Sequence, residues 1–250
     1  MAEILQVEHL SGGYSNQKHV LHDLSFHVKK GELVGLVGLN GAGKSTTIKH
    51  ILGLMEALTG TIKVDGLTIQ EDKTAYRSKL AYIPETPNLY EQLTLREHLE
   101  MSAMAYGVDK AAFESRMPQL LSLFRMENRL DWFPGHFSKG MKQKVMIMCA
   151  FLVHPELYVV DEPFVGLDPI GIQAFLDLMI EMKQKGAGIL MSTHILSTAE
   201  QYCDRFILLH EGKIAMQGTM DELRESVNDP QVSLHDIYVS VAKGEKPWEK

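Results

Sequence analysis

The sequence is poor in cysteine and in long apolar runs. Its 250 residues include two cysteines, Cys149 and Cys203, which lie far apart and lack the C-x-x-C spacing of a metal or redox motif. This excludes a disulfide framework, and we expect two buried free thiols. The longest unbroken apolar run, Val145 to Val153, has nine residues, whereas a membrane-spanning helix needs about 20. We therefore expect no transmembrane helix.

A strong charge of one sign is also missing. The chain has 25 Lys and Arg against 32 Asp and Glu, a net charge of -7 and no Lys/Arg tract, which argues against a non-specific nucleic-acid binder. Residues 1–10 have no basic start followed by an apolar stretch, so we expect no secretory signal and a cytoplasmic location. With 45% hydrophobic and 23% charged residues, the composition excludes a disordered or fibrous chain.

Strand and helix patterns alternate along much of the chain. The first forty or so residues read as strands, and the apolar run 33–37 predicts a strand buried on both faces. A helical period follows at Ile48, Ile51, Leu52 and Met55. Further strands are predicted in the second half of the chain, at 157–160, 188–192, 205–210 and 214–217. This alternation predicts an α/β fold.

The middle of the chain, by contrast, reads as a helical lobe. Thr94 and Glu97 form a capping box that starts a helix ending near Gly107. A second helical stripe runs over 113–124, and Pro118 is expected to strain or shorten it. A third helix is predicted from the residue after Ser138 to Val153.

Residues 38–46, GLNGAGKST, form a glycine-rich loop between a buried strand and an amphipathic helix. Gly38, Gly43, Lys44 and Ser45 match G-x-x-x-x-G-K-[ST], the phosphate-binding P-loop. Its backbone N–H groups and the helix N-terminus favour a bound anion, Lys44 reaches the β- and γ-phosphates, and Ser45 is a ligand for Mg²⁺. Thr46 caps the helix or contacts the α-phosphate. The remaining loop residues in the predicted site are Asn40, Gly41 and Ala42.

Two adjacent carboxylates, Asp161 and Glu162, end the apolar strand 157–160. An isolated Asp-Glu pair is most often a solvated loop. Beside a P-loop and after a buried strand, the pair instead favours cation binding and proton transfer. Asp161 is then a ligand of Mg²⁺, directly or through water, and Glu162 is the general base that polarises the attacking water.

Together these motifs, in this order, resemble the ATP-binding subunit of ABC transporters over about residues 3–220. The P-loop and the Asp161-Glu162 pair match the two Walker motifs, and FSKGMKQK (137–144) occupies the place of the LSGGQ-like signature. The other matching elements are Tyr14 at the adenine-stacking position, Tyr82-Ile83-Pro84-Glu85 at the Q-loop, Gly166-Leu167-Asp168 at the D-loop and Ser192-Thr193-His194 at the switch histidine.

The resemblance implies an ATP hydrolase whose two subunits pair head-to-tail around each ATP. Ser138 and Gly140 are then expected to contact the γ-phosphate held by the opposite subunit. His194 contacts the γ-phosphate and helps to orient the water beside Glu162. The partner is either a second copy or a related ATPase, and an integral-membrane permease subunit holds the pair on the cytoplasmic face of the cell membrane.

Two motifs depart from the family pattern. Lys139 and Met141 replace Gly and Gln in the signature, and Glu85 replaces the Q-loop glutamine. A carboxylate oxygen of Glu85 can still face Mg²⁺ and the water, with one more negative charge. Lys139 adds a positive charge near the phosphate or is simply solvated.

The resemblance also implies a domain arrangement. A RecA-like, P-loop NTPase core with a mixed sheet and an N-terminal antiparallel β part covers 1–90 and 155–220. An inserted helical subdomain covers 91–154, and a helical tail covers 221–250.

Segment 192–214 resembles the exporter-type branch, and FSKGMKQKV resembles the Ecs-type bacterial ATP-binding subunits. Two alternatives are a soluble ABC-type ATPase that acts on nucleic acid or ribosomes, and a nucleotide-binding regulator without hydrolysis. The single set of motifs and the absence of coiled-coil heptads disfavour the first, and Glu162 and His194 disfavour the second.

Overall fold

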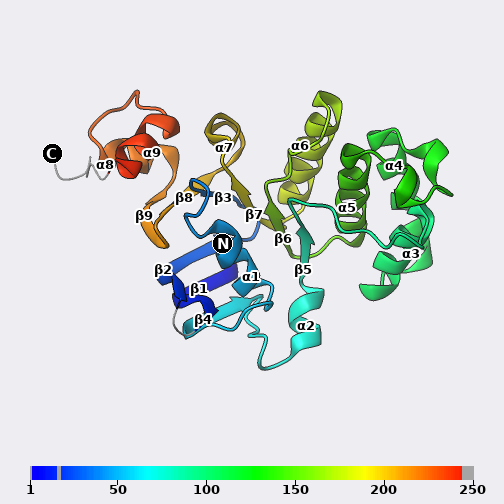
Figure 1. Ribbon diagram of the computed structural model, residues 1–250, viewed down its shortest axis with the longest axis horizontal. Coiled ribbons are helices and arrows are strands. Elements are labelled where there is room, and N and C mark those ends of the chain that lie inside the picture. The colour runs from blue at the N-terminus through cyan, green and yellow to red at the C-terminus, as the bar shows by residue number, and fades with distance from the viewer. Residues whose placement is uncertain (1, 16–17, 244–250) are drawn as a thin grey trace.

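The computed structural model, which describes residues 2–15 and 18–243, contains two β-sheets surrounded by helices (Figure 1). The smaller sheet is antiparallel, with the order β2-β1-β4. In the larger sheet, β5-β6-β7-β3-β8-β9, strand β9 runs antiparallel to β8 and the other neighbours are parallel. The predicted mixed sheet with an N-terminal antiparallel part is therefore confirmed. The strands are β1 (Glu3–Ser15), β2 (Lys18–Lys29), β3 (Leu33–Val37), β4 (Thr59–Val64), β5 (Leu80–Ile83), β6 (Leu157–Asp161), β7 (Gly188–Thr193), β8 (Arg205–His210) and β9 (Lys213–Gly218).

Two groups of helices lie at opposite ends of the larger sheet. Figure 1 shows α3, α4 and α5 beyond the β5 edge, and α8 and α9 beyond the β9 edge. The α-helices are α1 (Lys44–Ile51), α2 (Lys73–Ser78), α3 (Leu95–Ala105), α4 (Lys110–Phe124), α5 (Lys139–Val153), α6 (Pro169–Gln184), α7 (Leu196–Tyr202), α8 (Met220–Ser226) and α9 (Leu234–Ala242), and the 3₁₀-helices are Glu127–Arg129 and Pro134–His136.

The central strands are buried on both faces, as the apolar run 33–37 predicts. Successive side chains of a strand point to opposite faces of the sheet. On β6, Tyr158 and Val160 therefore pack in the core shared with α5 and α6, whereas Leu157 and Val159 pack in the core shared with α1 and the smaller sheet. The ends of β3 and β6 are thus held rigidly between two cores.

Several local expectations about the helices are confirmed. The capping box of Thr94 and Glu97 begins α3, and the Ser138 hydroxyl accepts the Met141 N–H at the start of α5. The expected helical turn at Met55 is wrong, because α1 ends at Ile51 and Gly53 follows with a φ of 63°. A glycine in the left-handed region is a common end of a helix.

The expectation that Pro118 shortens its helix is also wrong, because α4 runs through it without a break. Pro118 and Glu114 are exposed, so water can satisfy the Glu114 carbonyl that the missing N–H leaves free. Leu121 and Phe124, on the buried side, anchor the helix in the core with α3 and α5. Tertiary packing therefore outweighs the local cost of the proline.

Both cysteines are free and partly covered. Burial raises the pKa of the Cys149 thiol to about 11 and also raises the pKa of Cys203. Within residues 2–15 and 18–243, no helix combines the length and the apolar character needed to cross a membrane.

Candidate nucleotide-binding and catalytic site

The P-loop lies between the end of β3 and the start of α1, as its motif predicts. Gly41 and Gly43 adopt φ values of 86° and 113°, which glycine adopts readily. Gly38 is required for another reason, since a Cβ there would lie 2.8 Å from the Leu209 carbonyl oxygen. The loop therefore directs backbone N–H groups toward the space before α1, and the dipole of α1 adds positive potential there.

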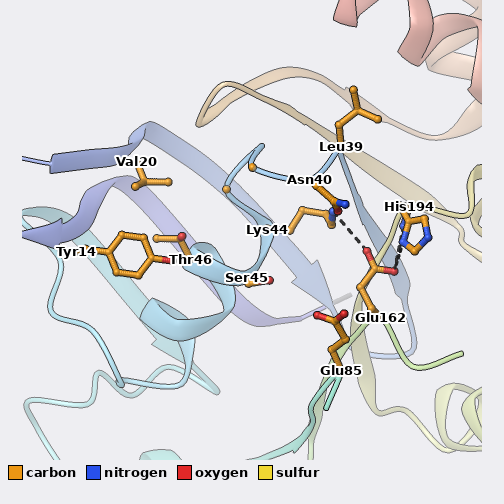
Figure 2. A pocket seen from close by; sticks show the side chains of 12 residues that line it. Tyr14, Val20, Leu39, Asn40, Lys44, Ser45, Thr46, Glu85, Glu162 and His194 are labelled. Carbon is orange, nitrogen blue, oxygen red and sulfur yellow. Dashed lines mark hydrogen bonds and ion pairs between the residues drawn. The ribbon is translucent and has the colours of Figure 1, made fainter. Parts of the chain in front are cut away.

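A cleft of about 510 Å³ opens in front of this loop (Figure 2). Gly38, Ala42 and Asp161 are absent from its lining, although they belong to the predicted site. Val20 and Leu39 line the cleft, although the prediction did not include them. The lining residues are Tyr14, Val20, Leu39, Asn40, Gly41, Gly43, Lys44, Ser45, Thr46, Glu85, Glu162 and His194.

Tyr14 and Thr46 lie at one end of the cleft, and Glu162 and His194 lie at the other (Figure 2). The Tyr14 side chain is 61% exposed, and the Lys49 ammonium lies 5.5 Å from its ring centre. Such an open aromatic face suits a stacked base. Tyr14 and Val20 come from β1 and β2, whose pairing brings them to the same wall.

Three charged or polar side chains form a chain of contacts at the inner end. Lys44 Nζ donates to the Gly38 carbonyl oxygen at 2.7 Å and lies 3.4 Å from Glu162 Oε1. Glu162 Oε2 accepts the His194 backbone N–H at 3.2 Å and lies 2.7 Å from His194 Nδ1 (Figure 2). A carboxylate accepts hydrogen bonds, so Nδ1 carries the proton in this arrangement. The structure thus brings together Lys44, Glu162 and His194, the three residues predicted to be catalytic.

Glu162 has an uncommon backbone conformation. Its φ is 45°, in the left-handed region that non-glycine residues adopt rarely and often at functional sites. The Glu162 N–H donates to the Ser192 carbonyl oxygen at 3.2 Å, and the Ser192 hydroxyl donates to Asp161 Oδ1. Asp161 and Ser192 face each other across β6 and β7, so the sheet register holds the carboxylate pair. The prediction gave Ser192 no role of its own, although its position two residues before His194 in the sequence indicated that it lies near the site.

Carboxylates concentrate at the carboxyl ends of β5 and β6. Burial, together with the charges of Asp161 and Glu85, raises the pKa of Tyr82 to about 12. Glu162 Oε1, which is buried, has no hydrogen-bond partner among the described residues. This negative potential, and a carboxylate oxygen that meets the Lys44 ammonium at 3.4 Å without a hydrogen bond, fit a bound cation.

These donors fit Mg²⁺ in particular. The candidate donors, Ser45, Glu85 and Asp161, supply hydroxyl and carboxylate oxygens, which Mg²⁺ prefers. Within the described part of the chain, no group of three or more His, Cys, Asp or Glu is placed to hold a metal. Mg²⁺ commonly uses few protein ligands together with phosphate oxygens, so a metal here needs the nucleotide as well.

Ser138, Gly140 and Asp168 form a second group that does not line this cleft. Ser138 caps α5, and a Cβ on Gly140 would lie 2.3 Å from the Gly166 carbonyl oxygen. Asp168 caps α6 and accepts a hydrogen bond from Lys144 at 2.8 Å, which lowers the pKa of Asp168. The signature and D-loop segments therefore pack against each other, outside the cleft of their own chain.

The sequence of residues 21–165 matches the family model described as ABC transporter. The chain belongs to the ABC transporter family. It is 58% identical to the ABC-type transporter ATP-binding protein EcsA of Bacillus subtilis (strain 168), over 96% of this chain and 97% of that protein.

Solved structures of this family have the same fold. An ATP-binding subunit of an ABC transporter superposes with a TM-score of 0.93 at 57% identity, over 95% of this chain and 99% of the other. A bacterial Atm1-family ABC exporter with ATP bound superposes with a TM-score of 0.79 at 25% identity, over 95% of this chain and 41% of the exporter chain.

Membership in the ABC transporter family establishes the activity. The chain is an ATP-binding protein and an ATPase of a transport system. The resemblance to the ATP-binding subunits of ABC transporters, and to the Ecs-type subunits among them, is confirmed. The comparisons give no support to an ATPase that acts on nucleic acid.

Proposed function

We propose that this ABC ATPase is the motor subunit of an exporter, paired head-to-tail with a second ATPase subunit. An integral-membrane permease subunit holds the pair on the cytoplasmic face of the membrane. The observation that carries the catalytic part is the contact chain of Lys44, Glu162 and His194 beside the P-loop.

Glu162 is the general base in this proposal. Its buried Oε1 has no hydrogen-bond partner among the described residues and takes the proton of the attacking water. His194 holds Oε2 through its N–H and Nδ1, which fixes the plane of the carboxylate. Lys44 keeps its hydrogen bond to the Gly38 carbonyl and neutralises charge on the β- and γ-phosphates.

The rest of the cleft binds and orients ATP. The exposed ring of Tyr14 stacks on the adenine, and the P-loop N–H groups and Thr46 hold the phosphates. Ser45, Asp161 and Glu85 would hold Mg²⁺. The ion would supply positive charge that offsets the negative charge of the phosphates.

The second subunit completes the site. Ser138 and Gly140 lie outside the cleft of their own chain, at the N-terminus of α5, where backbone N–H groups favour an anion. They therefore act on the ATP of the partner, and Asp168 lies beside them. The partner is either a second copy or a related ATPase, and closure around ATP is a population shift driven by the shared ligand.

The proposed domain division follows this arrangement. The core of residues 1–90 and 155–220 carries the P-loop, Glu162 and His194. The helical subdomain of residues 91–154 carries the signature, and the tail of residues 221–250 includes α9. Residues 244–250 of that tail lie outside the described residues.

Replacement of Glu162 by glutamine tests the catalytic assignment. Glu162→Gln keeps the size of the side chain and loses the basic oxygen, so turnover is expected to fall by about 10²- to 10⁴-fold. ATP binding persists and a dimer accumulates, as measured by calorimetry and by size exclusion with ATP. The matched control is Glu114→Gln, on the exposed face of α4. Hydrolysis by Glu162→Gln at the rate of the control removes Glu162 from the role of base.

Purification from membranes tests the transport assignment. An integral-membrane protein that co-purifies with the chain and raises its ATPase activity supports the proposal. Hydrolysis stimulated by RNA or DNA, without such a partner, contradicts it.

A further inference from the structure

One peptide group of the P-loop is held on both sides. The Gly38 carbonyl oxygen accepts a hydrogen bond from Lys44 Nζ at 2.7 Å. The Leu39 N–H, on the same planar unit, donates to the Tyr238 hydroxyl at 2.6 Å. Because the unit is planar, a rotation that breaks one contact also displaces the other.

The Tyr238 hydroxyl has little freedom to move. Tyr238 belongs to α9 and is 3% exposed. Its hydroxyl also donates to the Leu209 carbonyl oxygen at 3.2 Å, so its proton is committed to β8 and a lone pair is left for the Leu39 N–H. Burial raises the pKa of Tyr238, which keeps the hydroxyl protonated.

Helix α9 is also hydrogen-bonded to α7, the helix that follows the switch histidine His194. Glu200 of α7 accepts the Leu234 N–H at 3.1 Å and a hydrogen bond from Arg224 at 3.3 Å. A second cleft, of about 520 Å³, lies between α7 and α9, and both Leu39 and His194 reach its wall. Helix α9 therefore spans the P-loop and the switch segment.

We propose that Tyr238 is a positioning residue that acts on Lys44 through the Gly38–Leu39 peptide. The hydroxyl keeps the Gly38 carbonyl turned toward the ammonium group, so Lys44 is held at the mouth of the phosphate site before ATP arrives. Without it, the Leu39 N–H turns to solvent, because the Leu39 side chain is already 56% exposed. The tail helix thereby sets the affinity for nucleotide. This inference rests on the proposed role of Lys44 in ATP binding.

Replacement of Tyr238 by phenylalanine removes the hydroxyl and keeps the ring. The matched control is Tyr106→Phe, whose hydroxyl donates to the Leu80 carbonyl oxygen at 2.8 Å, away from the P-loop. For Tyr238→Phe, the Kd and KM for MgATP are expected to rise by about three- to tenfold, the size of one hydrogen bond. The kcat at saturating ATP is expected to stay within about twofold of the wild-type value. The Tm is expected to fall no more than the Tm of Tyr106→Phe falls. Equal affinities of Tyr238→Phe and Tyr106→Phe overturn the inference, as does a loss confined to Tm or kcat.

A double-mutant cycle with Lys44→Ala tests the route through Lys44. If Tyr238 acts through Lys44, adding Tyr238→Phe to Lys44→Ala changes the Kd for ATP by less than about twofold. An equal loss in both backgrounds overturns the inference and leaves the proposed function intact. If Lys44→Ala itself leaves the Kd unchanged, the proposed role of Lys44 fails, and the inference fails with it.

Discussion

The contact between Gly140 and Gly166 predicts the sign of a stability change. Gly140 lies in the first turn of α5 with a negative φ, where alanine is ordinarily favoured by about 1 kcal/mol. A Cβ there would lie 2.3 Å from the Gly166 carbonyl oxygen, roughly 1 Å inside ordinary van der Waals contact with a backbone atom. Relief requires α5 or the D-loop to shift, and because the atom met is backbone, the cost lies in the upper part of the usual range, about 2–3 kcal/mol. We therefore expect Gly140→Ala to destabilise the chain by about 1–2 kcal/mol.

Urea unfolding measures this change as a lower midpoint at unchanged slope. Gly135→Ala is the matched control, because its Cβ would meet only Glu91 Oε2, at 3.8 Å, and its φ is not in the left-handed region. Both variants restrict the unfolded chain equally, so their difference reports the folded contact. The control is expected to stay within about 0.5 kcal/mol of wild type. A Gly140→Ala variant as stable as the control, or more stable, refutes the packing argument.

Two further predictions concern charged groups. Arg205 Nε donates to Glu32 Oε1 at 2.8 Å, and both side chains are nearly buried. Arg205→Met leaves the buried Glu32 carboxylate without its partner, so the free energy of unfolding measured in urea is expected to fall by about 3–5 kcal/mol. The double variant with Glu32→Gln recovers part of the loss; no recovery contradicts this reading. His154 is exposed at the surface, yet desolvation of its ring and the charges of Arg116 and Lys185 lower its pKa to about 4, whereas the unfolded value is about 6.5. Between these two pH values the unfolded chain binds one more proton than the folded chain, so the free energy of unfolding falls from pH 7 to pH 5. The fall is expected to be less steep in His154→Asn, since asparagine does not titrate in this range and tolerates the φ of 50°. Parallel pH dependences of wild type and His154→Asn contradict the assignment.

The features predicted from the sequence depend on short stretches of chain. The P-loop, the capping box of Thr94 and Glu97, the cap at Ser138 and the buried strand 33–37 each need only residue types at fixed spacing, and each has its expected structure. The relevant forces act within one turn or one strand, so the local sequence contains the information.

The sequence-based predictions of the fold and the site were incomplete where segments far apart in the sequence come into contact. The continuity of α4 through Pro118 depends on the core beneath it, and Val20 reaches the cleft only because β2 pairs with β1 beside Tyr14. The contacts of Gly140 with Gly166 and of Tyr238 with Leu39 join segments far apart along the chain. No pattern of spacing encodes such pairs.

The sequence by itself determined the chemistry of this protein: a phosphate-binding loop, a carboxylate pair after a buried strand and a histidine after another. Only the tertiary structure decided how these groups meet. The register of β6 and β7 places Glu162 beside His194, whereas Ser138 and Gly140 of the signature do not line the cleft of their own P-loop. Residue types specify which bonds are available, whereas distances between remote residues are set by the whole core.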